Sequence, residues 1–230
     1  MNPILLFNVL KSIIPNLNKE WKTKYALFLT NDNLYLFSEN LIFFHNQKPE
    51  IVRKPYFKDE IRVSIWDCMF YFEAVLNAFE SNSEQLKPNL IKALEETPFE
   101  IILLILGQRL TSASRRDETG IPPEKAILLE SCFQPFNNKI SIVERAWEKH
   151  VGRTKDHQSV LGAIKGNRNE KRILAEKLAH YFLDNKTWWN IFFHYKHDLV
   201  YEVRLENGQG MRWSADGKRF IGFLEDFLDE

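Results

Sequence analysis

The residues best suited to chemistry lie near the C-terminal end of the chain, between positions 188 and 219. They are two aromatic residues, a histidine, a glutamate and three arginines: Trp188, Phe192, His194, Glu202, Arg204, Arg212 and Arg219. Converging arginines can hold a carboxylate or a phosphate, and neighbouring rings can stack on bases or anchor a protein interface. These seven residues are therefore the predicted ligand-binding surface.

Alternating apolar residues in 189–195 and 199–205 predict two strands that each bury one face. Turn signals at 196–198, 207–209 and 216–217 extend this pattern into an antiparallel meander over 187–224. The register that follows from these turns pairs Phe193 with Tyr201, Ile191 with Val203, and Val203 with Trp213. The predicted buried face comprises Ile191, Phe193, Tyr201, Val203, Leu205 and Trp213.

The same register places Arg204 directly opposite Arg212 on the polar face of the sheet. Like charges that face each other across a sheet are destabilising, so a negative group must offset them. We expect the two guanidinium groups to share one carboxylate or phosphate, either that of Glu202 or that of a bound ligand.

An N-terminal β-hairpin and sheet segment is predicted for residues 25–65. Two apolar runs, 25–30 and 34–38, flank Asn31-Asp32-Asn33, and further strands are expected at 41–44, 51–53 and 61–65. Helix remains an alternative for 34–44, because short apolar runs do not distinguish the two structures.

The middle of the chain is predicted to be a helical bundle. Helical spacing and capping signals place helices near 84–95, 98–109, 123–133 and 141–151, and one more ends near Asn185. The predicted fold class is α+β. We expect one domain over 1–230, with a possible internal boundary in the loop 152–169.

Composition narrows the function only slightly. The 230 residues carry 31 basic and 31 acidic side chains, so no global field indicates a nucleic acid or a membrane as partner. Residues 141–220 carry 15 basic and 10 acidic side chains, a local excess of +5. Only two cysteines occur and no apolar run is long enough to span a bilayer, so we expect a cytoplasmic protein without membrane association.

No catalytic signature is present, and neither a metal nor another cofactor is expected. His194 and His197 are three positions apart, which on a strand directs them to opposite faces. A metal-dependent nuclease based on Asp198, Glu202 and Arg204 is also disfavoured, because the two acids are four residues apart and arginine does not titrate like lysine.

The sequence therefore favours a non-enzymatic binding or regulatory protein. Its C-terminal sheet face would engage an acidic partner, with a protein expected before a nucleic acid or a phosphorylated ligand. The alternative is an enzyme acting on a phosphorylated or nucleotide-like substrate, with an arginine anion clamp and either His194 or His150 as its acid–base group.

Overall fold

The computed structural model describes residues 2–47, 54–55, 57–151 and 160–226. The chain separates into two compact units. The N-terminal unit contains described residues 2–47 and 60–121, and the C-terminal unit contains 54–55, 57–59, 122–151 and 160–226. The division at 121/122 lies outside the loop 152–169, of which residues 152–159 are outside the described part. The single-domain organisation stays a prediction.

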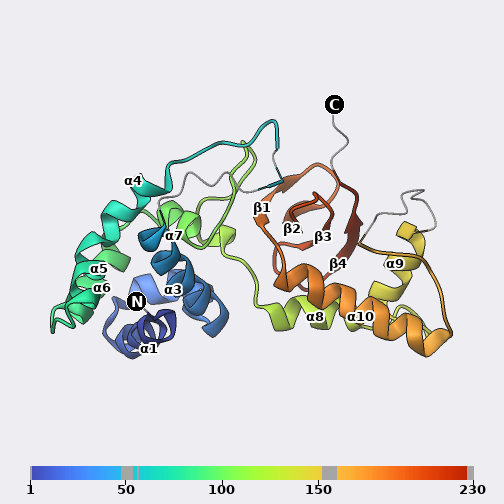
Figure 1. Cartoon of the computed structure of the whole chain (residues 1–230), viewed down its shortest axis with the longest axis horizontal. Coiled ribbons are helices and arrows are strands. Elements are labelled where there is room, and N and C mark those ends of the chain that lie inside the picture. The colour runs from blue at the N-terminus through green and yellow to red at the C-terminus, as the bar shows by residue number, and fades with distance from the viewer. Residues whose placement is uncertain (1, 48–53, 56, 152–159, 227–230) are drawn as a thin grey trace. The chain divides into compact units, whose positions relative to one another are not determined.

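The described N-terminal unit is built from helices (Figure 1). Its α-helices are α1 (Pro3–Ile13), α2 (Lys19–Lys24), α3 (Asn31–Asn46), α4 (Ile65–Met69), α5 (Glu73–Glu80), α6 (Leu86–Glu96) and α7 (Phe99–Ile105), with short 3₁₀ turns η1 (Ile14–Asn16), η2 (Ala26–Leu29), η3 (Phe70–Phe72) and η4 (Glu118–Gly120). Edge-to-face ring contacts join Phe28 to Phe37 and Phe37 to Phe72 in its buried core.

The predicted N-terminal hairpin is wrong, and the helical alternative holds. Leu34, Phe37, Leu41 and Phe44 recur at helical spacing and are all buried, so α3 buries one stripe against its neighbours. The polar triplet at 31–33 begins this helix instead of forming a hairpin turn. Residues 51–53 lie outside the described residues, and 61–65 contains only an isolated bridge from Ile61 to Leu110 before α4 begins.

Within its described residues, the C-terminal unit packs three helices around a four-stranded antiparallel sheet, which confirms the α+β class. The helices are α8 (Lys125–Phe133), α9 (Ile142–Val151) and α10 (Arg168–Asp184), and the strands are β1 (Trp188–His194), β2 (Asp198–Arg204), β3 (Gly210–Ser214) and β4 (Phe220–Leu224). α8 and α10 lie along one side of the sheet, and α9 lies beside β4 (Figure 1).

The strand order β1-β2-β3-β4 confirms the predicted meander, but its first two pairings are shifted by two residues. Ile191 pairs with Tyr201 and Trp213 also pairs with Tyr201, whereas Val203 had been the predicted partner of both. The first turn is 195–197 and not 196–198: His194 pairs with Asp198, and the His197 N–H donates to the His194 carbonyl. The predicted proximity of Trp213 and Phe220 is confirmed.

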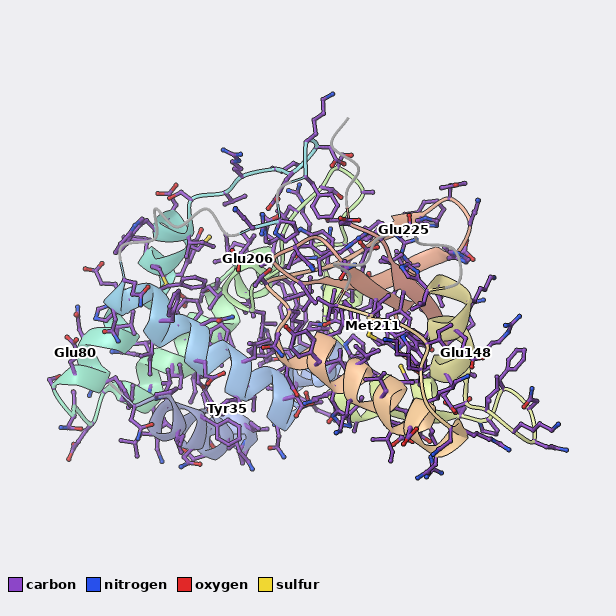
Figure 2. The ribbon with its side chains drawn as sticks, turned by 45° about the vertical axis from the view of Figure 1, so that its right-hand side comes forward. Tyr35, Glu80, Glu148, Glu206, Met211 and Glu225 are labelled. Carbon is purple, nitrogen blue, oxygen red and sulfur yellow. The ribbon has the colours of Figure 1, made fainter. Side chains whose placement is uncertain are left out.

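The apolar face of the sheet packs on the helices. The Trp213 indole donates to the Leu128 carbonyl of α8 over 3.2 Å, and Met211 lies on the same side, toward α10 (Figure 2). Five of the six predicted core residues are buried, namely Ile191, Tyr201, Val203, Leu205 and Trp213. Phe193 is the exception at 60% exposed, one residue before the end of β1.

Within the described residues, we find no helix with both the length and the apolar character needed to cross a membrane.

The burial of Val203 makes the meander testable. Val203 is fully buried at the centre of the sheet, so Val203→Asp would place an unpaired charge in the core and lower the free energy of unfolding by at least about 4 kcal/mol. Glu206→Ala, at an exposed position just beyond β2, should change it by less than about 0.5 kcal/mol. Urea unfolding followed by circular dichroism measures both, and equal stability of the two variants would contradict the assigned core.

Candidate functional site

A buried carboxylate organises the polar face of the sheet. Glu202 has a side chain only 2% exposed; its Oε1 accepts from Arg204 Nε at 2.6 Å, and its Oε2 accepts from Arg212 Nε at 2.7 Å. The predicted sharing of one carboxylate by the two arginines is therefore observed. The strand pairing differs from prediction, because Glu202 and not Arg204 lies opposite Arg212.

Arg204 donates hydrogen bonds to Glu202 and to two backbone carbonyls. Its Nη1 donates to the carbonyls of Gly208 at 2.7 Å and of Glu225 at 2.6 Å, just after β4 (Figure 2). It pairs with Gly210, where an added Cβ would lie 2.5 Å from Arg204 Cδ, so only glycine leaves room for the arginine. Arg204 is 7% exposed, which makes it a structural anchor more than an open anion clamp.

Trp188 lies beneath a segment from much earlier in the chain. The ring of Phe57 packs on it with a centroid separation of 4.7 Å, and the Thr187 hydroxyl donates to the Lys54 carbonyl at 2.7 Å. Trp188 is 1% exposed, so it does not offer the accessible stacking platform that we expected. Phe57 and the Lys54 carbonyl thus lie against one end of the polar face.

The opposite end of this face is open and carries His194. The Nε2 atom of His194 lies 3.0 Å from Arg212 Nη1, and its Nδ1 lies 3.2 Å from the Lys196 backbone N–H. Arginine can only donate, so the imidazole must present a lone pair and the protonated ring is disfavoured. Burial, together with the charges of Arg212 and His197, lowers the pKa of His194 below its ordinary value of 6.5.

His197 lies against His194, contrary to the expectation of opposite faces. The two rings stack with centroids 5.1 Å apart, because His197 belongs to the turn and not to a strand. Tyr195 also stacks on His194 at 4.8 Å. Partial burial and the charges of Arg212 and Arg219 lower the pKa of His197. We name His194, His197, Arg212 and Glu202 the histidine–arginine cluster.

Two further predicted site residues lie beside the cluster. Phe192 is half-buried, with the Arg212 guanidinium 6.0 Å from its ring centroid. Arg219 is exposed in the β3–β4 turn, where its backbone N–H donates to the Ser214 hydroxyl. The structure thus gathers Phe192, His194, Glu202, Arg212 and Arg219 at one end of the sheet and leaves Trp188 covered.

His150 belongs to a different site. It lines a pocket of about 330 Å³ between α9 and β4, together with Ala146, Lys149, Gly222, Phe223 and others. Neither His194 nor Arg204 is among the residues that line this pocket. A shared site of His150 with His194 and Arg204, which the enzyme hypothesis had required, is therefore not formed by this pocket.

Among the described residues, we find no group of three or more histidine, cysteine, aspartate or glutamate side chains arranged to hold a metal. The cysteines Cys68 and Cys132 are buried, and burial raises the pKa of Cys68 to about 11. At the open end of the sheet, His194 and His197 are candidate acid–base groups.

Residues 129–225 match the family model of the CdiA C-terminal tRNase toxin domain. The match covers less than half of the 230 residues, all of them in the C-terminal unit, and it includes the whole histidine–arginine cluster. We found no match to a curated protein or to a solved structure.

This similarity overturns the leading sequence hypothesis. A non-enzymatic binding protein is wrong as the main interpretation, because the matched family is described as a nuclease toxin. The finding favours the alternative of an enzyme with a nucleotide-like substrate. Sequence reasoning sought motifs with fixed spacing and did not foresee the turn that brings His197 against His194.

The shared carboxylate generates a stability prediction. Glu202→Gln keeps the side-chain shape but leaves the buried Arg204 and the half-buried Arg212 without their shared counter-charge, so the free energy of unfolding should fall by about 3–5 kcal/mol. Glu96→Gln is the matched control, because Glu96 forms an exposed pair with Lys92 and should cost less than about 1 kcal/mol. Urea unfolding compares them, and an unchanged midpoint for Glu202→Gln would show that the pairing is dispensable.

Proposed function

We propose that the C-terminal unit is a ribonuclease that acts on tRNA, with His194 and His197 as its acid–base pair. The observation that carries the proposal is the contact between His194 and Arg212, within the region similar to a tRNase toxin domain. A histidine kept neutral at pH 7 beside a fixed cation combines a proton acceptor with a phosphate-stabilising charge.

The cluster suits cleavage that uses the ribose 2′-hydroxyl as nucleophile. One imidazole accepts the 2′-hydroxyl proton while the 2′-oxygen forms a bond to phosphorus. The bond from phosphorus to the 5′-oxygen breaks, and the second imidazole donates a proton to that leaving oxygen. The products are a 2′,3′-cyclic phosphate and a 5′-hydroxyl, and no external reactant is consumed.

The close stacking of the two histidines disfavours protonation of both rings at once. Two imidazolium ions at a centroid separation of 5.1 Å would repel each other, so a pair that has bound one proton holds one neutral and one protonated ring. This is the state in which one ring can act as base and the other as acid. We assign His194 as the base, because the Arg212 guanidinium beside its Nε2 disfavours its protonated form, and His197 as the acid.

Arg212 and Glu202 have different tasks in this proposal. Arg212 has a side chain 15% exposed and lies within hydrogen-bonding distance of His194, so it can contact the scissile phosphate. Glu202 is too deeply buried to reach a substrate; it is a positioning residue that fixes the Arg212 guanidinium. The proposal takes up the nucleic-acid partner that the sequence left possible, and the acidic protein partner stays a prediction.

Replacing the base gives the direct test of activity. We expect the full chain to cleave purified tRNA and His194→Ala to reduce the rate about 100- to 10,000-fold, the usual contribution of a positioned proton-transfer group. Gel analysis and end-group mapping should reveal 2′,3′-cyclic phosphate and 5′-hydroxyl ends.

His180→Ala is the matched control for this loss. His180 is exposed on α10, outside the cluster, so its replacement should leave the rate unchanged. Full cleavage by His194→Ala, or absence of any tRNA cleavage by the wild-type chain, would overturn the proposal.

The pH dependence tests the role of Arg212. A lowered pKa keeps His194 neutral at pH 7, so the acidic limb of kcat/KM for tRNA cleavage should lie below pH 6.5. Arg212→Gln removes a positive charge that disfavours the imidazolium ion, which raises the pKa of His194 and moves this limb to higher pH. Arg212→Lys retains the charge and should retain the limb even if the rate falls. The same limb in both variants would exclude the electrostatic role.

A further inference from the structure

The most exposed aromatic side chain in the described part of the sheet is next to the cluster. Tyr195 lies in the β1–β2 turn and is 79% exposed, although its ring stacks on that of His194 at 4.8 Å and 28°. His194 in turn stacks on His197. Tyr195 therefore extends the imidazole pair outward as an aromatic surface that is largely open to solvent.

Positive charge surrounds this ring. The Lys196 ammonium lies 5.1 Å from its centroid. The two turns at this end, 194–198 and 212–219, carry four basic residues, Lys196, Arg212, Lys218 and Arg219, against two acidic ones, Asp198 and Asp216. Asp216 accepts hydrogen bonds from the Ser214 hydroxyl and from the Lys218 backbone N–H, so its carboxylate is engaged within its own turn. An exposed ring among cations suits a base and its flanking phosphates.

We propose, on the basis of the ribonuclease function above, that Tyr195 is a stacking platform for an unpaired base beside the scissile phosphate. The substrate class that follows is single-stranded RNA, including the loops and the unpaired ends of tRNA. In a duplex each base is already stacked between its neighbours, and the deep, narrow major groove of A-form RNA does not admit a side chain to the base faces. A base must be unpaired to reach a ring that is adjacent to the catalytic histidines.

The chain supplies a matched control at the same turn. Phe193 is 60% exposed but alternates to the opposite face of β1 from His194, and it pairs with Leu199. It tests whether any exposed ring at this end of the sheet contributes, or only the one that is continuous with the imidazole stack.

The experiment measures binding separately from cleavage. A fluorescein-labelled 2′-O-methyl RNA oligonucleotide lacks the nucleophile, so its Kd for the full chain can be obtained by anisotropy as a single strand and as the annealed duplex. We expect the single strand to bind more tightly than the duplex. Tyr195→Ala should weaken single-strand binding by about 5- to 150-fold, the range that corresponds to loss of one base–aromatic stack. Tyr195→Phe should retain binding, because stacking needs the ring and not the hydroxyl, and Phe193→Ala should leave it unchanged.

The possible failures can be told apart. Equal affinity for duplex and single strand, equal losses in Tyr195→Ala and Phe193→Ala, or no RNA binding would each overturn the stacking role. If tRNA is cleaved with unchanged kcat/KM by Tyr195→Ala, the ribonuclease stands and the platform is wrong. If wild type binds the single strand through Tyr195 but never cleaves tRNA, the ribonuclease proposal fails and the base-binding surface remains.

Discussion

The buried carboxylate of Glu202 is the interaction on which the rest of the C-terminal unit depends. It is almost inaccessible and neutralises part of the charge of two arginines, one of which anchors the β2–β3 turn and the residue after β4. An ion pair this deep is maintained only where each partner finds further polar contacts, because desolvation of both ions costs several kcal/mol. Gly210, which has no side chain, leaves the space that the Arg204 side chain needs to make these contacts. The other arginine, fixed in the same way, sets the charge beside His194.

Period-two alternation predicted which sheet residues share a face but could not determine their partners. A shift of two residues keeps every side chain on its original face, so apolar residues still meet apolar residues in both registers. The two registers differ in the first turn, where Asp198 has a left-handed backbone (φ 57°) and pairs with His194. The shared carboxylate was predicted from a repulsion between Arg204 and Arg212 that the observed register largely avoids. The pairing of Glu202 with Arg212 achieves the same neutralisation more directly.

Other features of the structure have no signal in the local sequence that could have predicted them. Phe57 covers Trp188 across more than a hundred residues of sequence, and nothing in the pattern around either residue indicates the other. The segment around Leu34 and Phe37 was predicted as strand because short apolar runs fit both the helical and the strand period. In the structure it is a helix that buries these residues and packs on α1. The start of α9 does carry a local signal: the Ser141 backbone N–H donates to the Glu144 carboxylate and the Glu144 backbone N–H donates to the Ser141 hydroxyl, three positions apart.

Overall neutrality does not exclude a local anion-binding site, because charge acts locally. At physiological salt a surface charge is screened over about 8 Å, so a phosphate at the open end of the sheet responds to the nearest side chains and not to the sum over 230 residues. Lys196, Arg212 and Arg219 lie in or beside two adjacent turns that carry four basic and two acidic residues, whereas most acids of the chain lie elsewhere. A neutral chain of this kind can hold a few nucleotides at one end of a sheet without the long cationic surface that tight, sequence-independent binding to duplex DNA requires. A short contact of that kind suits an enzyme that engages one exposed segment of RNA and then releases its products.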